Sequence, residues 1–366
     1  MDLMMQSTAY MLLKTKYRDF AAPTVRIKVE GRDLIESYHA EISEVEVDLT
    51  SEYPASGCSF DVSGEYVASK SDFDTKGSVS LLELGAKVEV YLGYIATELV
   101  FMGLITELSY HFEENTAPYV HVECMDAKCL LMKVQRLEIF KETMVSQAVT
   151  TLLQSQPVGG YLKGNQVDRM AKEDQPITLN MESCYDFIVR QAQYAGFEFF
   201  IVCGKAYFRK TPAFGQPIMT LSFGSGLLSA DLSLRGAELV NQVKVVGIDP
   251  KTDKEVSGVA KATGKFGKGA APKRMIAGTE RVYLDAAAQT AAQAKSRATA
   301  LMSGIQHRFG LIECRCEGLP DLVPGRTVKI SGVMDRADQS YYITGVRHRV
   351  NEGGFITNIE ARIDHL

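Results

Sequence analysis

The chain has 366 residues, of which 46% are hydrophobic and 23% are charged. These proportions are those of ordinary soluble globular domains and argue against a disordered or fibrous protein, and the length is enough for about two or three domains. The formal net charge of -5 argues against a protein that coats nucleic acid, because such binding needs many Lys and Arg side chains against the phosphates.

Apolar runs, the first residues and the cysteines indicate where the chain folds. The apolar runs, such as Leu99–Ile105 and Phe199–Val202, are far shorter than the ~20 residues of a transmembrane helix. Met1–Tyr10 lacks the successive basic, apolar and small-residue regions of a secretory signal. The seven cysteines include no C-x-x-C pair, which predicts buried thiols in a reducing compartment. We therefore expect folding in the cytosol and no stable membrane insertion.

Residues 1–130 are predicted to form a first β-barrel. Apolar and polar residues alternate in Val25–Val29 and again in Val45–Leu49, which is the pattern of half-buried strands. Turn residues such as Gly31 and Gly85 separate the predicted strands. Many short alternating strands with glycine turns are typical of a barrel or a sandwich.

Residues 131–215 are predicted to form an inserted α+β domain. Val145–Leu153 has apolar residues at the spacing of an amphipathic helix. A second helix is expected to begin with the capping box Ser183–Asp186 and to end at Gly196. Two apolar strands follow, and Gly204–Lys205 is expected to form the tight turn between them.

Residues 216–366 are predicted to form a second β-barrel that carries two inserts. Residues 251–278 are rich in Gly, Ala and Lys with little apolar periodicity, so we expect a mobile basic loop. Residues 285–303 are rich in alanine, with Asp285 as the expected N-cap and Gly304 after the expected end. This composition predicts a helix.

One pattern occurs twice in the sequence. L-x-x-G-x-x-V-[EK]-[VI] is found at Leu82–Val90 and at Leu322–Ile330. Each copy leads into a strand that contains Ile-Thr, and then into a further strand. The Ile-Thr pairs begin at Ile105 and Ile343, and the further strands include His121–Cys124 and Asn358–Ala361. This order predicts duplication of one small barrel around the α+β domain, although unrelated antiparallel domains can also share glycine turns and alternating valines.

Several segments resemble a known family over nearly the whole chain. The most specific is Gly318–Ile330, G-L-P-D-L-V-P-G-R-T-V-K-I, which is followed by Tyr341–His348, Y-Y-I-T-G-V-R-H. A third segment, Ser183–Phe199, combines a helix, a glycine and an aromatic strand. These segments resemble the phage late control protein D group, which includes the hub region of type VI secretion spike proteins. The residues that carry the motif are Gly85, Pro324, Gly325, Tyr342 and His348.

The resemblance implies a fold, a role and a set of partners. The fold is mainly β with an α+β insertion: two similar tail-tube-like barrels and a helix-containing middle domain. The role is that of a structural baseplate hub in a contractile phage tail, tailocin or injection system, in which a homotrimer adapts the hexameric tail tube to a trimeric spike. The partners are the tail tube protein, a spike protein, baseplate wedge proteins and a tape measure protein, with transient passage of DNA or protein cargo. The chain would be made in the bacterial cytoplasm and then built into the baseplate of a phage or phage-like particle.

The end of the chain bears on the spike. The sequence stops at Leu366, directly after the second predicted barrel. We therefore expect the spike to be a separate polypeptide.

No cluster in the sequence indicates a catalytic, cofactor or metal site, and we expect none. Cys314 and Cys316 share one strand face, but no further zinc ligands accompany them, and neither Cys184 nor Cys203 has an evident base. Gly264–Gly269 lacks the spacing of a phosphate-binding loop. A basic group could contact an acidic partner or the cargo in the lumen, or could simply be solvated. It consists of Lys261, Lys265, Lys268, Lys273 and Arg274.

Two other classes of function remain open. A tail-associated cell-wall hydrolase would need a carboxylate pair or a Cys/His arrangement in one compact domain, and the sequence has no evident example. A carbohydrate-binding tail-tip protein would place aromatic residues at loop tips, and the absence of Trp weighs mildly against it.

Overall fold

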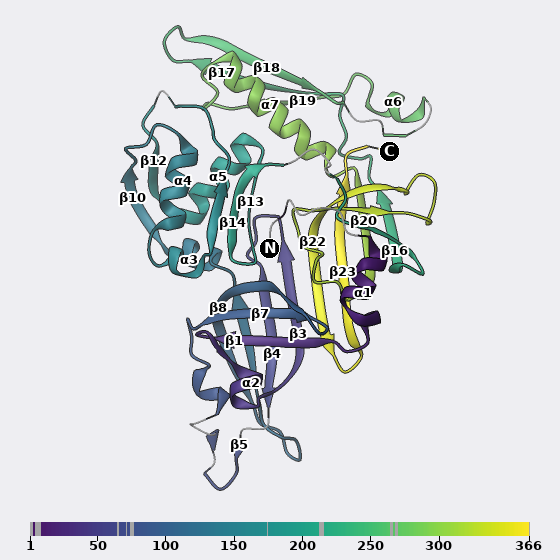
Figure 1. Ribbon diagram of the computed structural model, residues 1–366. Helices are drawn as coiled ribbons and strands as arrows, with labels where there is room; N and C mark the ends of the chain where they lie inside the picture. The colour runs from purple at the N-terminus through teal and green to yellow at the C-terminus, as the bar shows by residue number, and fades with distance from the viewer. Residues whose placement is uncertain are drawn as a thin grey trace.

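The computed structural model describes residues 3, 9–63, 66–70, 72–73, 77–173, 175–211, 216–263, 266–267 and 270–365. Figure 1 shows one barrel at the bottom, a second at the right, a helical module at the left and a small sheet with a long helix at the top. The predicted fold class, mainly β with a helix-containing middle domain, is confirmed. The domain boundaries at residues 130 and 215 stay predictions.

The strands of both barrels belong to one sheet, which has 13 strands among the described residues. The first barrel contributes β1 (Thr24–Val29), β2 (Arg32–Asp33), β3 (Glu41–Thr50), β4 (Gly57–Ser63), β7 (Lys87–Gly93), β8 (Thr97–His111) and β9 (Tyr119–Met125). The second contributes β15 (Thr220–Phe223), β16 (Gly226–Leu234), β20 (Gly310–Glu317), β21 (Thr327–Ile330), β22 (Gln339–Asn351) and β23 (Gly354–Ile363).

The order of these strands separates the two barrels, of which the described strand pairings close the second. The sheet runs β2-β1-β7-β8-β9-β4-β3 and then β22-β21-β15-β16-β20-β23. An additional pairing of β22 with β23 closes the second barrel. The two halves meet where β3 pairs antiparallel with β22. Alternate residues of the strands face one shared hydrophobic core, for example Phe60, Val90 and Ile343, as a period-two pattern requires.

Short elements flank the barrels. Figure 1 places the helix α1 (Tyr10–Lys16) beside the second barrel and α2 (Leu34–Tyr38) on the first. The first barrel also carries a two-stranded hairpin, β5 (Tyr66–Val67) and β6 (Asp72–Phe73). Short 3₁₀ helices occur at Arg18–Phe20, Ser78–Leu81 and Val158–Tyr161.

The middle module has a core of its own. It contains α3 (Lys128–Lys133), β10 (Gln135–Ile139), α4 (Val145–Gln154), β11 (Gly164–Val167), β12 (Thr178–Ser183), α5 (Cys184–Ala195), β13 (Phe197–Val202) and β14 (Lys205–Lys210). The predicted ends of α5 are confirmed: the Ser183 side chain accepts from the Asp186 backbone N–H at 2.9 Å, and Gly196 ends the helix at φ +69°. These contacts are an N-cap and a left-handed C-terminal residue.

The turn between β13 and β14 lies one residue earlier than predicted. Cys203 and Gly204 both have positive φ, +51° and +76°, which is the conformation of a two-residue hairpin turn. Lys205 already belongs to β14 and lies opposite Val202.

A third core includes part of the predicted mobile loop. That prediction was wrong for Lys254–Lys261 and Ala271–Ile276, whereas residues 264–265 and 268–269 lie outside the described residues. Strands β17 (Gln242–Asp249), β18 (Lys254–Lys261) and β19 (Glu280–Leu284) form a sheet, with α6 (Ala271–Ile276) after β18. The helix α7 (Ala291–Gln306) packs on this sheet. A Cβ atom at Gly258 would collide with the backbone nitrogen of Lys295 in α7. Gly258 is therefore a small residue that lets α7 approach the sheet closely.

The predicted start and end of the alanine-rich helix were also wrong. Thr290 is the N-cap, and it forms a capping box with Gln293. The side chain of Asp285 instead accepts from the Ala287 backbone N–H, in a turn before the helix. Gly304 lies inside α7. Among the described residues, no helix combines the length and apolar character needed to cross a membrane.

Candidate functional site

Gly85 and Gly325, the glycines of the repeated pattern, occupy equivalent turns. Their φ angles are +88° and +85°, in the region that favours glycine. The N–H of Gly85 donates to the Ile105 carbonyl at 2.8 Å, and the N–H of Gly325 donates to the Ile343 carbonyl at 2.9 Å. The predicted duplication is therefore present in the backbone hydrogen bonds of both turns.

The equivalence extends through the next two strands of each copy. A β-bulge interrupts the β8–β9 pairing between Ile105 and Glu107, and another interrupts the β22–β23 pairing between Ile343 and Gly345. Beside the bulges, the Thr106 hydroxyl donates to the Glu123 carbonyl at 3.2 Å. The Thr344 hydroxyl donates to the Glu360 carbonyl at 3.3 Å. Bulges set register, so the two copies share strand register as well as sequence.

The two barrels are joined side by side within the chain. Residues Val45–Thr50 of β3 lie opposite Gly345–Val350 of β22. On the outer face Arg347 contacts Asp48 at 2.6 Å and Arg349 contacts Glu46 at 2.8 Å. Arg347, Asp48 and Arg349 are exposed and Glu46 is half-buried, so each ion pair contributes little to stability, about 0–1 kcal/mol. The backbone pairing fixes the orientation of one barrel relative to the other.

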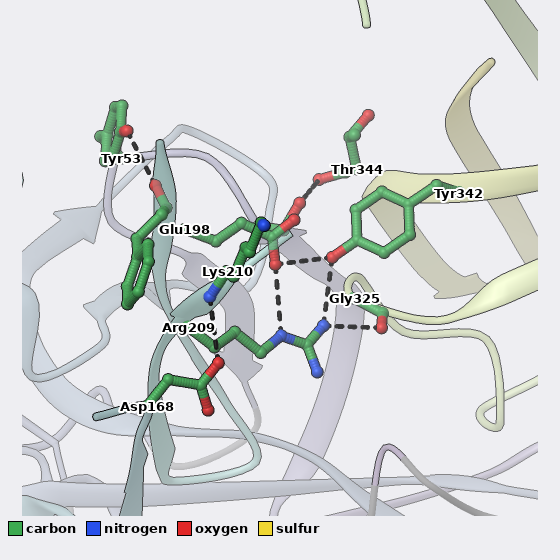
Figure 2. Close-up of polar contacts among 10 residues, drawn as sticks. Tyr53, Asp168, Glu198, Arg209, Lys210, Gly325, Tyr342 and Thr344 are labelled. Carbon is green, nitrogen blue, oxygen red and sulfur yellow. Dashed lines mark hydrogen bonds and ion pairs between the residues drawn. The ribbon is translucent and has the colours of Figure 1, made fainter. Parts of the chain in front are cut away.

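A polar cluster attaches the middle module to the second barrel, and Figure 2 shows its side chains pointing toward one another. Tyr342 donates to Glu198 at 2.7 Å. Arg209 donates to the Gly325 carbonyl at 2.9 Å and to the Tyr342 hydroxyl at 3.1 Å, and its Nε lies 3.3 Å from Glu198. Burial raises the pKa of Glu198 above its ordinary value, against hydrogen bonds from Tyr342 and Arg209. The motif residues Gly325 and Tyr342 thus meet the middle module directly.

A buried lysine attaches the middle module to the first barrel. The Nζ of Lys128 donates to the carbonyls of Glu52, Tyr53 and Pro54 at 3.0, 3.2 and 2.6 Å. Burial lowers the pKa of Lys128 to about 8, while the charge of Asp126 acts in the opposite direction. This contact was not predicted from the sequence. The sequence near Lys128 indicates it only through two charged residues, Asp126 and Lys128, in an apolar stretch.

His348 is fully buried in β22 and takes part in a chain of hydrogen bonds. Its Nε2 lies 3.1 Å from the Leu322 carbonyl and its Nδ1 lies 2.9 Å from the Thr357 hydroxyl. The Leu319 backbone N–H donates to the same hydroxyl at 3.0 Å. Burial lowers the pKa of His348 to about 4, so the imidazole is neutral at pH 7. These contacts connect the Leu319–Leu322 turn, which precedes the motif residue Pro324, to the two long strands.

The predicted basic group is spread over separate elements. Lys261 is exposed at the end of β18, and Lys273 and Arg274 are exposed on α6. Lys265 and Lys268 lie outside the described residues. Its role in contacting a partner or the cargo stays a prediction.

The thiols are buried and protonated. All seven cysteines are free and buried, and burial raises the pKa of Cys203 to about 11 and that of Cys314 to about 12. A protonated thiol is a poor nucleophile and a poor metal ligand. In the described part of the chain, no group of His, Cys, Asp and Glu side chains is arranged to hold a metal ion.

Comparisons with known proteins give one family match and several solved structures of similar fold. A family model described as Alg8 N-terminal domain matches residues 20–352, and no curated protein sequence gives a significant match. The tail protein of prophage MuSo2 from Shewanella oneidensis is 13% identical with a TM-score of 0.70, over 93% of this chain and 98% of that one. A tail protein from Neisseria meningitidis is 14% identical with a TM-score of 0.69, over 94% and 97%.

A third solved structure extends the likeness to secretion systems. It is an Escherichia coli component of the type VI secretion system, described as structurally similar to the tail proteins gp27 and gp5 of bacteriophage T4. It is 12% identical with a TM-score of 0.55, over 92% of this chain and 76% of that one. The resemblance of the sequence to phage baseplate and type VI spike hubs is thereby confirmed at the level of the fold.

Proposed function

The chain belongs to the Alg8 N-terminal domain family, and from its tail-protein fold we propose that it is a noncatalytic structural hub of a baseplate. In this role a homotrimer joins a hexameric tail tube to a trimeric spike in a contractile phage tail, tailocin or injection system. The finer assignment to the late control protein D group is part of the same proposal.

The observation that carries the proposal is the duplicated barrel. Two units with equivalent turns at Gly85 and Gly325 lie side by side in one sheet through β3 and β22. Three such chains supply six similar units, which can face a sixfold tube on one side and a threefold spike on the other. Closed rotational symmetry is the usual way for head-to-tail contacts to avoid open filaments.

The partners follow from this role. We propose contacts with the tail tube protein, a spike protein, baseplate wedge proteins and a tape measure protein, and passage of DNA or protein cargo through the ring. The exposed residues Lys261, Lys273 and Arg274 are candidates for contact with an acidic partner or the cargo. The chain is made in the bacterial cytoplasm and becomes part of the particle.

A reconstitution experiment tests the hub function. The chain is expressed with candidate tube and spike proteins from the same genome, and the complex is isolated through a tag on the spike. The hub proposal predicts a complex that contains all three proteins, with three copies of this chain for each spike trimer. Absence of this chain from the spike complex would contradict the proposal.

A test for catalysis addresses the hydrolase alternative. Purified protein incubated with peptidoglycan should release no soluble fragments if its role is structural. Reproducible cleavage that a single substitution abolishes would overturn the noncatalytic assignment.

A further inference from the structure

Strand β22 changes partner along one edge. Residues Gln339–Tyr342 pair with β21, and Gly345–Val350 of the same edge pair with β3 of the other barrel. In the equivalent strand β8, residues Thr97–Leu104 pair with β7. After Ile105, this edge of β8 pairs with no strand in the described part of the chain.

The shared bulges identify which β8 residues correspond to the paired part of β22. Glu107 follows the bulge in β8 as Gly345 does in β22. Residues Glu107–His111 therefore correspond to Gly345–Arg349, the part of β22 that β3 covers. In this open segment the side chain of Tyr110 is 49% exposed, and its ring centroid lies 5.9 Å from that of Phe73 in β6.

The second barrel has a matching open edge on β16. Cys124 and Ala361 are the last residues of the matching segments His121–Cys124 and Asn358–Ala361. Cys58 of β4 pairs with Cys124, and Ile312 of β20 pairs with Ala361. Cys58 and Ile312 are therefore equivalent in the two copies. Val47 of β3 pairs with Cys58 and Leu232 of β16 pairs with Ile312. Strand β16 is therefore the counterpart of β3, with Leu232 in the place of Val47.

The edge of β16 that corresponds to the paired edge of β3 is largely free. Strand β15 pairs with β16 only at Gly226 and Leu227, and no described strand covers the same edge from Leu228 onward. Leu228 and Leu234 are 47% and 43% exposed. Exposed strand edges with apolar side chains are sites of pairing with another chain.

We propose that β16 of one copy pairs antiparallel with β8 of a second copy, in the register that β3 and β22 adopt within the chain. This proposal rests on the trimeric hub and names the contact between its copies. Transfer of the internal register places Glu107 opposite Arg235, Leu108 opposite Leu234, Ser109 opposite Ser233, Tyr110 opposite Leu232 and His111 opposite Asp231.

The side chains brought together in this register are complementary. Glu107 and Arg235 carry opposite charges, and both are exposed. His111 and Asp231 take the places of Arg349 and Glu46, the equivalent pair inside the chain, and an imidazole N–H can donate a hydrogen bond to a carboxylate. Leu108 and Leu234 form an apolar pair. A shift of one residue would lose these matches and turn each side chain to the other face of the sheet.

The hydrogen-bond pattern of the internal contact selects the best pair for a crosslink. The Ser51 backbone N–H donates to the Thr344 carbonyl at 2.9 Å, so in an antiparallel ladder the Asp48–Arg347 pair three residues away is non-hydrogen-bonded. Side chains lie closer in such pairs. The equivalent pair between copies is Ser233 with Ser109, two small side chains on one face, at a spacing that suits a disulfide.

Disulfide trapping tests the register directly. Full-length S109C and S233C variants are mixed and oxidised, and S109C mixed with S229C is the matched control, since Ser229 is exposed on the same face of β16. The seven native cysteines are buried and should give little background. An intrachain D48C/R347C variant confirms that the oxidant closes a pair of this geometry. We expect several-fold more disulfide dimer from S109C with S233C than from the control mixture.

The outcomes separate this proposal from the hub function. Equal yields from S233C and S229C would overturn the strand register, whether or not the wild-type chain joins the spike complex. Charge reversal tests the pairing of Glu107 with Arg235. R235E should reduce the self-association of the chain, measured by light scattering, and E107R combined with R235E should restore it. A double variant no better than R235E would contradict the proposed pairing.

Discussion

Comparison of the equivalent turns at Gly85 and Gly325 separates the effect of packing against the middle module from the effect of backbone strain. Replacement of either glycine by alanine places a Cβ atom at a φ near +85° to +88°, which costs roughly 1–2 kcal/mol. At Gly85 this Cβ would meet no atom within 4 Å, whereas at Gly325 it would lie 2.8 Å from Phe200 Cζ and 3.0 Å from Arg209 Nη2. Overpacking of this kind adds about 1–3 kcal/mol.

The expected order of stability follows from these magnitudes. Gly85→Ala should lower the free energy of unfolding by about 1–2 kcal/mol, and Gly325→Ala by about 2–5 kcal/mol. Urea unfolding followed by circular dichroism gives the total change. Hydrogen exchange should place the additional loss of protection in β13, β14 and β21, because a multi-module chain need not unfold in one step. Equal losses for the two variants, or a greater loss for Gly85→Ala, would refute the account of the polar cluster.

Three further substitutions test other parts of the fold. Lys128→Met removes the donor to three carbonyls and leaves Asp126 buried without its lysine. We expect the free energy of unfolding, measured with urea, to fall by about 3–5 kcal/mol. An unchanged urea midpoint would contradict the buried contact. Gly258→Ala should increase hydrogen exchange in α7, because the new Cβ collides with the backbone at Lys295; unchanged protection would show that the helix does not pack there. Burial lowers the pKa of His348 from 6.5 in the unfolded chain to about 4 in the folded chain. As the pH falls through this range, the unfolded chain takes up a proton that the folded chain does not. Up to about 3 kcal/mol of the free energy of unfolding is therefore lost between pH 7 and 4. His348→Gln should remove this part of the pH dependence of urea unfolding, and an identical pH dependence in the variant would exclude His348 as its source.

The duplication could be predicted from the sequence because it rests on local patterns. The glycine at a positive-φ turn and the Ile-Thr pair at a bulge each have a physical requirement that few residues meet. The spacing of these residues is therefore retained in both copies, and the structure confirms the same backbone bonds around Gly85 and Gly325.

Features that depend on distant parts of the chain could not be predicted in the same way. Gly258 lies in a stretch with the composition of a flexible loop, and only the helix packed against it explains why this residue is small. The partners of Lys128 and Arg209 lie in other modules. The pairing of β3 with β22 joins segments about 300 residues apart in the sequence, so neither strand alone indicates it.

Cryo-microscopy of an assembled tail tip tests the central claim most directly. The account predicts three copies of this chain in a ring, with first and second barrels alternating and β16 of each copy beside β8 of the next. The turns at Gly85 and Gly325 should then occupy equivalent positions around one channel. Six copies in the ring, or barrels of one chain that do not both line the channel, would contradict the symmetry-adapting hub.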